Sequence, residues 1–183
     1  MQVRYQSAED RLLWQLRTQG GELFALWLTR RLLQQLMPPL NALVTQTAVA
    51  RVAPQANVMP EAREMMAQVA RARPLPGTDF STPFNPQAVA QPLGPQPLLP
   101  TEVDLGPRAD GRGLRFAARE PGGRSLNLQL SADLATALMR LIDQALAEAD
   151  WGLSAAAASH SARADAQDAG DPPVLPAKPG LLN

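Results

Sequence analysis

The amino-acid sequence predicts an α+β fold made of two βββα repeats, each an antiparallel sheet followed by one amphipathic helix, that share a single core. Three observations lead to this prediction. Residues 11–45 and 113–147 alternate apolar and polar side chains with period two and then change to helical spacing. Glycine-containing turns separate the alternating segments. The two stretches also align without gaps at an offset of 102 residues.

The first repeat is expected to contain three strands. Residues 2–6 and 11–18 alternate in polarity, with a polar turn between them, and residues 22–28 form the next apolar run. Gly20 and Gly21 separate the last two strands. A Gly-Gly pair can adopt positive φ at both central positions of a tight hairpin, so these strands are expected to be antiparallel neighbours.

Thr29 marks the predicted start of the first helix. Its hydroxyl can accept a hydrogen bond from a free backbone N–H of the first turn. Apolar residues follow at helical spacing, namely Leu32, Leu33, Leu36, Leu40, Leu43 and Val44. Pro38 and Pro39 interrupt this pattern, and because proline cannot donate the helical hydrogen bond, the helix is expected to kink or break there.

The second repeat follows the same order of elements. Residues 101–105 predict a strand, and Asp110-Gly111 is a hairpin signal that leads into a second strand over residues 113–119. Residues 125–130 alternate in polarity and predict the third strand.

Ser131 is the predicted N-cap of the second helix. Asp133 lies in the first turn of that helix, where the helix dipole favours a negative charge. The amphipathic pattern then continues to the region of Trp151 and Gly152, where the helix is expected to end.

The alignment of the two repeats extends beyond their leucines. It matches Leu12 with Leu114, Trp14 with Phe116, Leu16 with Ala118, Gly20-Gly21 with Gly122-Gly123, and Thr29 with Ser131. Chance could align apolar residues, but it is less able to align a glycine pair and two capping hydroxyls in the same register. The predicted organisation is repeat one over residues 1–50, a short helix (60–72) and Pro-rich linker over 51–100, repeat two over 101–153, and a disordered tail over 154–183.

The composition limits the possible functions. The formal net charge is zero, so no global field draws the protein to nucleic acid or to an anionic membrane. The chain has no cysteine, which excludes disulfides and thiolate zinc sites. No secretory signal and no membrane span is predicted, so a cytoplasmic location is expected. The preference for arginine over lysine, with abundant alanine, indicates a GC-rich bacterial genome.

The chemical inventory argues against an enzyme. The one histidine, His160, lies in the predicted disordered tail, where no scaffold could position it. Glu9 and Asp10 form a carboxylate pair, but they lie in a predicted turn and are expected to be solvated. The sequence therefore predicts no catalytic residue, no metal site and no cofactor.

Two sheet faces are candidates for binding. In repeat one, Leu13, Leu23 and Trp27 are expected on the face away from the helix, where another helix around Met65, the second repeat or another subunit should cover them. Arg30 and Arg31 lie beside them, and these arginines are expected either to be solvated, to pair with the acidic turn, or to form an anion or partner site. The candidate interaction surface therefore comprises Leu13, Leu23, Trp27, Arg30 and Arg31. The candidate nucleic-acid face, polar and basic, comprises Arg17, Arg115, Arg119, Asn127 and Gln129.

The duplicated unit also resembles a known group of proteins. Its Gly-Gly hairpins and the strand–Ser–helix junction in "SLNLQLSADLATALMRLIDQAL" are similar to the PUR and Whirly-like single-strand nucleic-acid binders. The resemblance implies that an open sheet face contacts bases and phosphates. This chain differs in having three predicted strands per repeat instead of four, and fewer aromatic and basic residues on its sheets. The stretch "WLTRRLL" is separately similar to a segment of other bacterial proteins, which implies no activity.

Two functions are consistent with these features. The first is a non-enzymatic bacterial module that associates with itself or with a protein partner through its sheet surfaces. The alternative is a sequence-tolerant binder of single-stranded nucleic acid, in which aromatic stacking contributes about 1–3 kcal/mol per base. Trp27 is the one good stacking candidate on an outer face, which places this function second.

Overall fold

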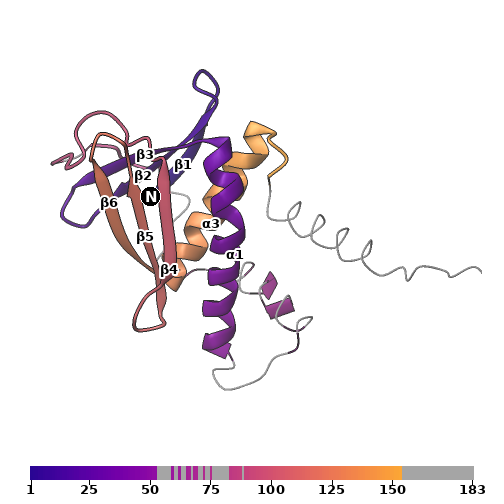
Figure 1. Ribbon diagram of the computed structural model, residues 1–183. Coiled ribbons are helices and arrows are strands. Elements are labelled where there is room, and N and C mark those ends of the chain that lie inside the picture. The colour runs from indigo at the N-terminus through magenta and orange to yellow at the C-terminus, as the bar shows by residue number, and fades with distance from the viewer. Residues whose placement is uncertain are drawn as a thin grey trace, which may run out of the picture.

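The computed structural model describes residues 1–52, 83–87 and 89–153, together with isolated positions between 59 and 75. These residues form an α+β fold of two βββα units, as the sequence predicts (Figure 1). The first unit contains β1 (Gln2–Gln6), β2 (Arg11–Arg17), β3 (Leu23–Leu28) and α1 (Arg30–Val52). The second unit contains β4 (Glu102–Pro107), β5 (Gly113–Arg119), β6 (Ser125–Ser131) and α3 (Ala132–Ala149).

The two sheets have the same topology and the same register. Each is an antiparallel meander, with strand orders β1-β2-β3 and β4-β5-β6. Leu12 lies opposite Leu28 in the first sheet, and Leu114 lies opposite Leu130 in the second, a pairing displaced by the same offset in both strands. The duplication is therefore present in the strand pairing as well as in the sequence.

The glycine pairs act differently from the prediction. Only the second glycine of each pair has positive φ, with 84° at Gly21 and 83° at Gly123. The N–H of Gly21 donates to the Thr18 carbonyl at 3.1 Å, and the N–H of Gly123 donates to the Glu120 carbonyl at 3.0 Å. Both hairpins therefore place one left-handed glycine after a tight turn, the arrangement of a hairpin loop that ends in a glycine bulge.

Both predicted helix caps are confirmed. The Thr29 hydroxyl accepts from the Leu32 N–H at 3.2 Å, and the Ser131 hydroxyl accepts from the Leu134 N–H at 3.2 Å. Each cap satisfies a first-turn donor that has no partner inside the helix, and each helix begins at the residue after its cap.

Helix α1 does not break at its prolines, contrary to one of the expected outcomes. It runs unbroken through Pro38 and Pro39. Both prolines are exposed, as are Gln34 and Gln35, whose carbonyls lose the helical hydrogen bond. The two carbonyls that lose helical hydrogen bonds therefore belong to the solvent-facing side of α1. Leu36 is buried on the opposite side of the helix.

The helices join the two units into one core. Helix α1 packs on β4, β5 and α3, all from the second unit, and α3 packs on β1 as well as on its own β5 and β6. The sequence-based expectation that each helix packs on its own sheet is therefore incomplete. Trp14 and its repeat equivalent Phe116 meet edge to face, with ring centroids 5.0 Å apart at 87°. Both side chains are 1% exposed, which places this contact at the centre of the shared core.

Part of the predicted linker is packed, although its proline content suggested no packed element. We call residues 89–98 the strap. The strap pairs in parallel with the outer edge of β3, where Leu26 lies beside Leu98. The Trp27 N–H donates to the Leu98 carbonyl at 2.8 Å, and Leu98 is 0% exposed. Leu98 therefore attaches the end of the strap to β3 through its backbone and through its buried side chain.

Other predicted segments lie partly or wholly outside the described residues. In the helix predicted over 60–72, the described positions that are helical are Ala62, Met65, Met66, Gln68, Val69 and Ala72. Residues 154–183, including His160, are not described. Among the described residues, no helix is long and apolar enough to cross a membrane.

The contact between Trp14 and Phe116 generates a stability prediction. Phe116→Ala should lower the free energy of unfolding by about 3–5 kcal/mol, because it opens a cavity in the core that both units share. Urea unfolding followed by far-UV circular dichroism measures this loss. The exposed Met65→Ala change serves as the control, with an expected effect below about 0.5 kcal/mol. Two separate unfolding transitions in either protein would contradict a single shared core.

Candidate interaction surfaces

The outer face of the first sheet carries an apolar group at its centre. Leu13 on β2 lies directly opposite Trp27 on β3, and Ala25 lies two residues away on the same face. All three side chains are half-buried. We call these three residues the Trp27 face. It is the face that the sequence predicted to be apolar, and it is covered only in part within the described residues.

Leu23 is separate from this group. Its side chain is 7% exposed, and its N–H donates to the Ala90 carbonyl of the strap at 2.9 Å. Met65, which was a candidate to cover the Trp27 face, is 69% exposed. Leu23 is therefore buried and bonded through its backbone to the strap, whereas Leu13 and Trp27 are only half-buried.

The second sheet provides an internal comparison for the Trp27 face. The repeat offset matches Leu13 with Arg115, Ala25 with Asn127 and Trp27 with Gln129. These three equivalents are exposed. The same strand architecture therefore accepts polar residues at the positions where the first sheet has apolar ones.

The candidate nucleic-acid face is less basic than the sequence suggested. Arg115 and Arg119 do share the outer face of the second sheet with Asn127 and Gln129. However, β4 adds Glu102 and Asp104 to that face, with Glu102 directly opposite Arg119 and 3.9 Å from it. Two carboxylates thus accompany the two guanidinium groups. Arg17 does not belong to this set, because it lies on the first sheet.

The two arginines at the start of α1 differ in their contacts. Arg30 Nη2 donates to the Trp151 carbonyl at 3.3 Å, which ties the beginning of α1 to the end of α3. Arg31 is exposed. Asp10, a proposed partner of the pair, instead accepts from Tyr5 and from the Trp151 indole, both at 2.9 Å. The hydrogen bond that the Tyr5 hydroxyl donates to Asp10 raises the pKa of Tyr5.

A clamp at the β5–β6 turn holds the strap. Arg124 donates through Nε to Glu120 Oε2 at 2.6 Å and through Nη2 to Oε1 at 2.9 Å. Arg124 Nη1 also donates to the Leu93 and Gln96 carbonyls, both at 2.9 Å. The hydrogen bonds from Arg124 lower the pKa of Glu120 despite partial burial of the carboxylate, and the Leu99 N–H contributes as well. In the first unit, the equivalent residues are Thr18 and Glu22, so the clamp is specific to the second turn.

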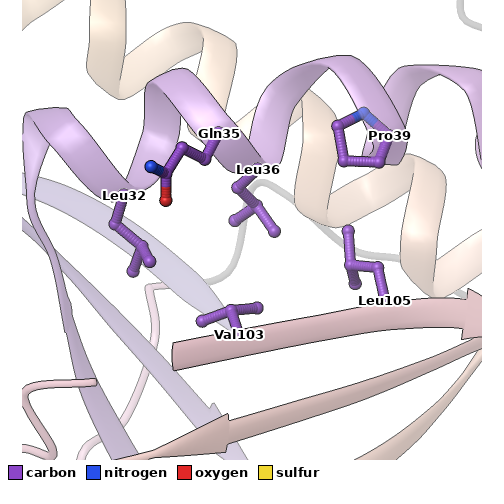
Figure 2. A pocket seen from close by; sticks show the side chains of 6 residues that line it. All are labelled: Leu32, Gln35, Leu36, Pro39, Val103 and Leu105. Atoms are coloured by element: carbon purple, nitrogen blue, oxygen red, sulfur yellow. The ribbon is translucent and has the colours of Figure 1, made fainter. Parts of the chain in front are cut away.

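A small apolar hollow separates α1 from β4, as Figure 2 shows. It has a volume of about 120 Å³, well below the ~300 Å³ of a small-molecule pocket. Its lining comprises Leu32, Gln35, Leu36 and Pro39 from α1 and Val103 and Leu105 from β4. The sequence analysis did not anticipate this hollow, because the crossing of α1 onto the second unit leaves no local signal in the chain.

The carboxylates of the described residues are dispersed, and two of them are engaged by hydrogen-bond donors. In that part of the chain, no three carboxylates or imidazoles lie close enough to hold a metal ion. The clamp carboxylate is engaged by Arg124, and Asp10 is engaged by two donors.

Comparison with protein-family models finds no match, and comparisons with curated proteins and with solved structures find no significant match either. The differences between equivalent positions of the two units are therefore the basis for proposing a function.

The clamp generates a prediction of pH dependence. The pKa of Glu120 is lower in the folded chain, so its ionised form stabilises the fold above the unfolded-state value, and this stabilisation is lost as the pH falls through the folded pKa. Urea unfolding of the wild type should therefore lose stability below about pH 4.3, and Glu120→Gln should lose less over that range. Glu102→Gln is the control, because the Glu102–Arg119 pair is exposed and should contribute little. An unchanged pH profile in Glu120→Gln would contradict the role of the clamp.

Proposed function

We propose that this protein is a non-enzymatic interaction module that associates with a second copy through the Trp27 face. One observation carries the proposal: the apolar residues of this face occupy positions where the second unit has arginine, asparagine and glutamine. Because the fold accepts polar residues there, folding alone does not require Leu13 and Trp27 to be apolar. Contact with another surface gives the reason for them.

The surroundings of the Trp27 face fit a protein contact. Leu13 and Trp27 are direct cross-strand neighbours, so they form one continuous patch. Gln2, Arg4 and Gln15 lie on the same face of β1 and β2 and supply a polar border. An apolar centre with a polar rim is the usual arrangement of a protein–protein interface, and tryptophan is enriched among the residues that dominate binding energy.

Single-strand nucleic-acid binding remains the second candidate. In its favour, Trp27 is half-buried and could stack on a base. Against it, the arginines of the second sheet share their face with Glu102 and Asp104, which reduces the positive potential that backbone binding needs. On the first sheet, Arg4 on β1 and Arg17 on β2 lie on the same face as Leu13 and Trp27, which is a second point in favour of nucleic-acid binding.

The test replaces residues of the Trp27 face by the residues that the second unit has at the equivalent positions. Trp27→Gln should raise the dissociation constant of the dimer about 30-fold, which corresponds to the loss of about 2 kcal/mol from an interface centre. Leu13→Arg should act in the same direction. Analytical ultracentrifugation across a concentration series measures both effects, and circular dichroism checks that each variant is folded.

Gln129→Ala and Arg115→Ala, at the equivalent positions of the second sheet, are the matched controls and should leave the dissociation constant unchanged. A wild-type chain that stays monomeric at all concentrations would overturn self-association. If that monomer binds a single-stranded oligonucleotide, and Arg115→Ala weakens the binding and reduces its salt dependence, the alternative function would replace the first.

A further inference from the structure

A polar hollow lies at the turn between β4 and β5, on the outer face of the second sheet. Its volume is about 460 Å³, within the ~300–1,000 Å³ range of small-molecule sites. We call this hollow the Arg115 pocket. Its lining comprises Pro107, Arg108, Ala109, Asp110, Arg115 and Gln129. Two arginines and one aspartate therefore give the pocket a net positive charge.

One cross-strand row places Arg115 between a glycine and an amide. Gly106 on β4 lies directly opposite Arg115, and Gln129 on β6 lies opposite it on the other side. A Cβ atom at Gly106 would lie 3.8 Å from Arg115 Nη2, so the guanidinium extends toward the glycine. A glycine inside a strand often marks a place where a ligand approaches closely. Because Gly106 has no side chain, space beside the guanidinium stays open.

The first unit shows that the fold does not require this glycine. The repeat offset matches Gly106 with Arg4, just as it matches Arg115 with Leu13. A long side chain is therefore accepted at the same place on the first sheet. Gly106 also has no positive φ that would exclude another residue. The open space beside Arg115 therefore has no explanation in the backbone of the strand.

The charges of the pocket are engaged unequally. Arg108 Nη2 donates to Asp110 Oδ2 at 2.7 Å, and Asp110 Oδ1 accepts from the backbone N–H of Arg112 at 3.0 Å. The side chain of Arg115, in contrast, makes no hydrogen bond or ion pair with any described residue. Arg115 therefore has all its donors available, while Asp110 is held by two donors of its own turn.

We propose that the Arg115 pocket binds a carboxylate group, which accepts two parallel hydrogen bonds from the Arg115 guanidinium. The guanidinium presents its N–H groups in a planar fork that matches the two oxygens of a carboxylate. Gln129, on the adjacent strand, lines the same pocket and has an amide that can bond the polar group next to the carboxylate. The proposal does not rest on the Trp27 face, because the pocket lies on the other sheet.

The charge balance favours a carboxylate over a phosphate. Arg108 and Asp110 neutralise each other, so the pocket has one uncompensated positive charge, that of Arg115. One carboxylate balances that charge. A phosphate monoester carries a charge of about −1.5 to −2 at pH 7 and would leave an excess of negative charge. Asp104 lies on the same sheet face, two residues before Gly106, and would repel that excess.

NMR titration of the full chain, followed at the Arg115 Nε–Hε signal, tests the proposal. The probes are N-acetylglycine, which has the carboxylate of a peptide chain end, glycolate, which is a small hydroxy acid, and inorganic phosphate. A carboxylate probe should shift the signal to saturation, and phosphate should bind at least about tenfold more weakly. Tighter binding of N-acetylglycine than of glycolate would identify a chain end as the source of the carboxylate, and the reverse order a small acid.

Two variants locate the binding. Arg115→Gln removes the fork, and Gly106→Leu fills the open space without changing the charge. Each should raise the dissociation constant of the carboxylate probe at least about tenfold. Arg119→Gln is the matched control, because it removes the same charge from the same strand and face outside the pocket. It should leave the dissociation constant within about twofold of the wild-type value. Circular dichroism checks that each variant is folded.

Several outcomes would overturn the proposal. If neither carboxylate probe saturates the Arg115 signal, the pocket holds no carboxylate. If phosphate binds as tightly as the carboxylates, or Arg119→Gln weakens binding as much as Arg115→Gln, the sheet face attracts anions without a defined site. If Gly106→Leu retains the wild-type affinity, binding occurs outside the pocket. Dimerisation through the Trp27 face is tested separately by Trp27→Gln.

Discussion

The contact between Trp14 and Phe116 joins the hydrophobic faces of the two units in one core. These residues are equivalent in the repeat, and each is buried against the other with its ring plane nearly perpendicular. Among the described residues, the Trp14 indole nitrogen has no hydrogen-bond partner, although an orphaned buried donor costs about 1–3 kcal/mol. The packing of a large ring at the centre of the core must offset that cost, which an edge-to-face aromatic pair helps to do.

The crossing of helices follows from this central contact. Once the two sheets meet through their middle strands, each helix can cover the first strand of the other unit, and α1 does so on β4 while α3 does so on β1. The ends of the crossing are then fastened by polar bonds, with Arg30 on the Trp151 carbonyl and the Trp151 indole on Asp10. The inner faces of both sheets serve the shared core, so variation between the units appears on the outer faces and the edges.

Local patterns predicted the local structure, and the duplication predicted the fold class. Alternation located the strands, and the hydroxyls of Thr29 and Ser131 located the helix starts, because both signals act within a few residues. The packing of the strap was missed, since this proline-rich segment is held by Leu98 beside β3 and by Arg124 at a distant turn, and neither contact leaves a local pattern. The acidic contribution of β4 to the second outer face was missed for a related reason, because only the register places Glu102 opposite Arg119. The binding of a partner depends also on the surface of the other molecule, for which the sequence of this chain carries no pattern.

The packing of α1 on the second unit has a consequence during protein synthesis. Helix α1 ends at Val52, but β4, the first of its two main packing partners along the chain, begins only at Glu102. At about 5–20 residues per second, roughly 50 further residues occupy a ribosome for about 3–10 s. Throughout that interval the apolar stripe of α1 lacks β4 and α3, on which it packs, so the nascent first unit presents a transient ligand for any factor that binds exposed apolar helices. The intervening chain can vary in length at little thermodynamic cost, because closure entropy grows only with the logarithm of length. Each added residue nevertheless prolongs the exposure in direct proportion.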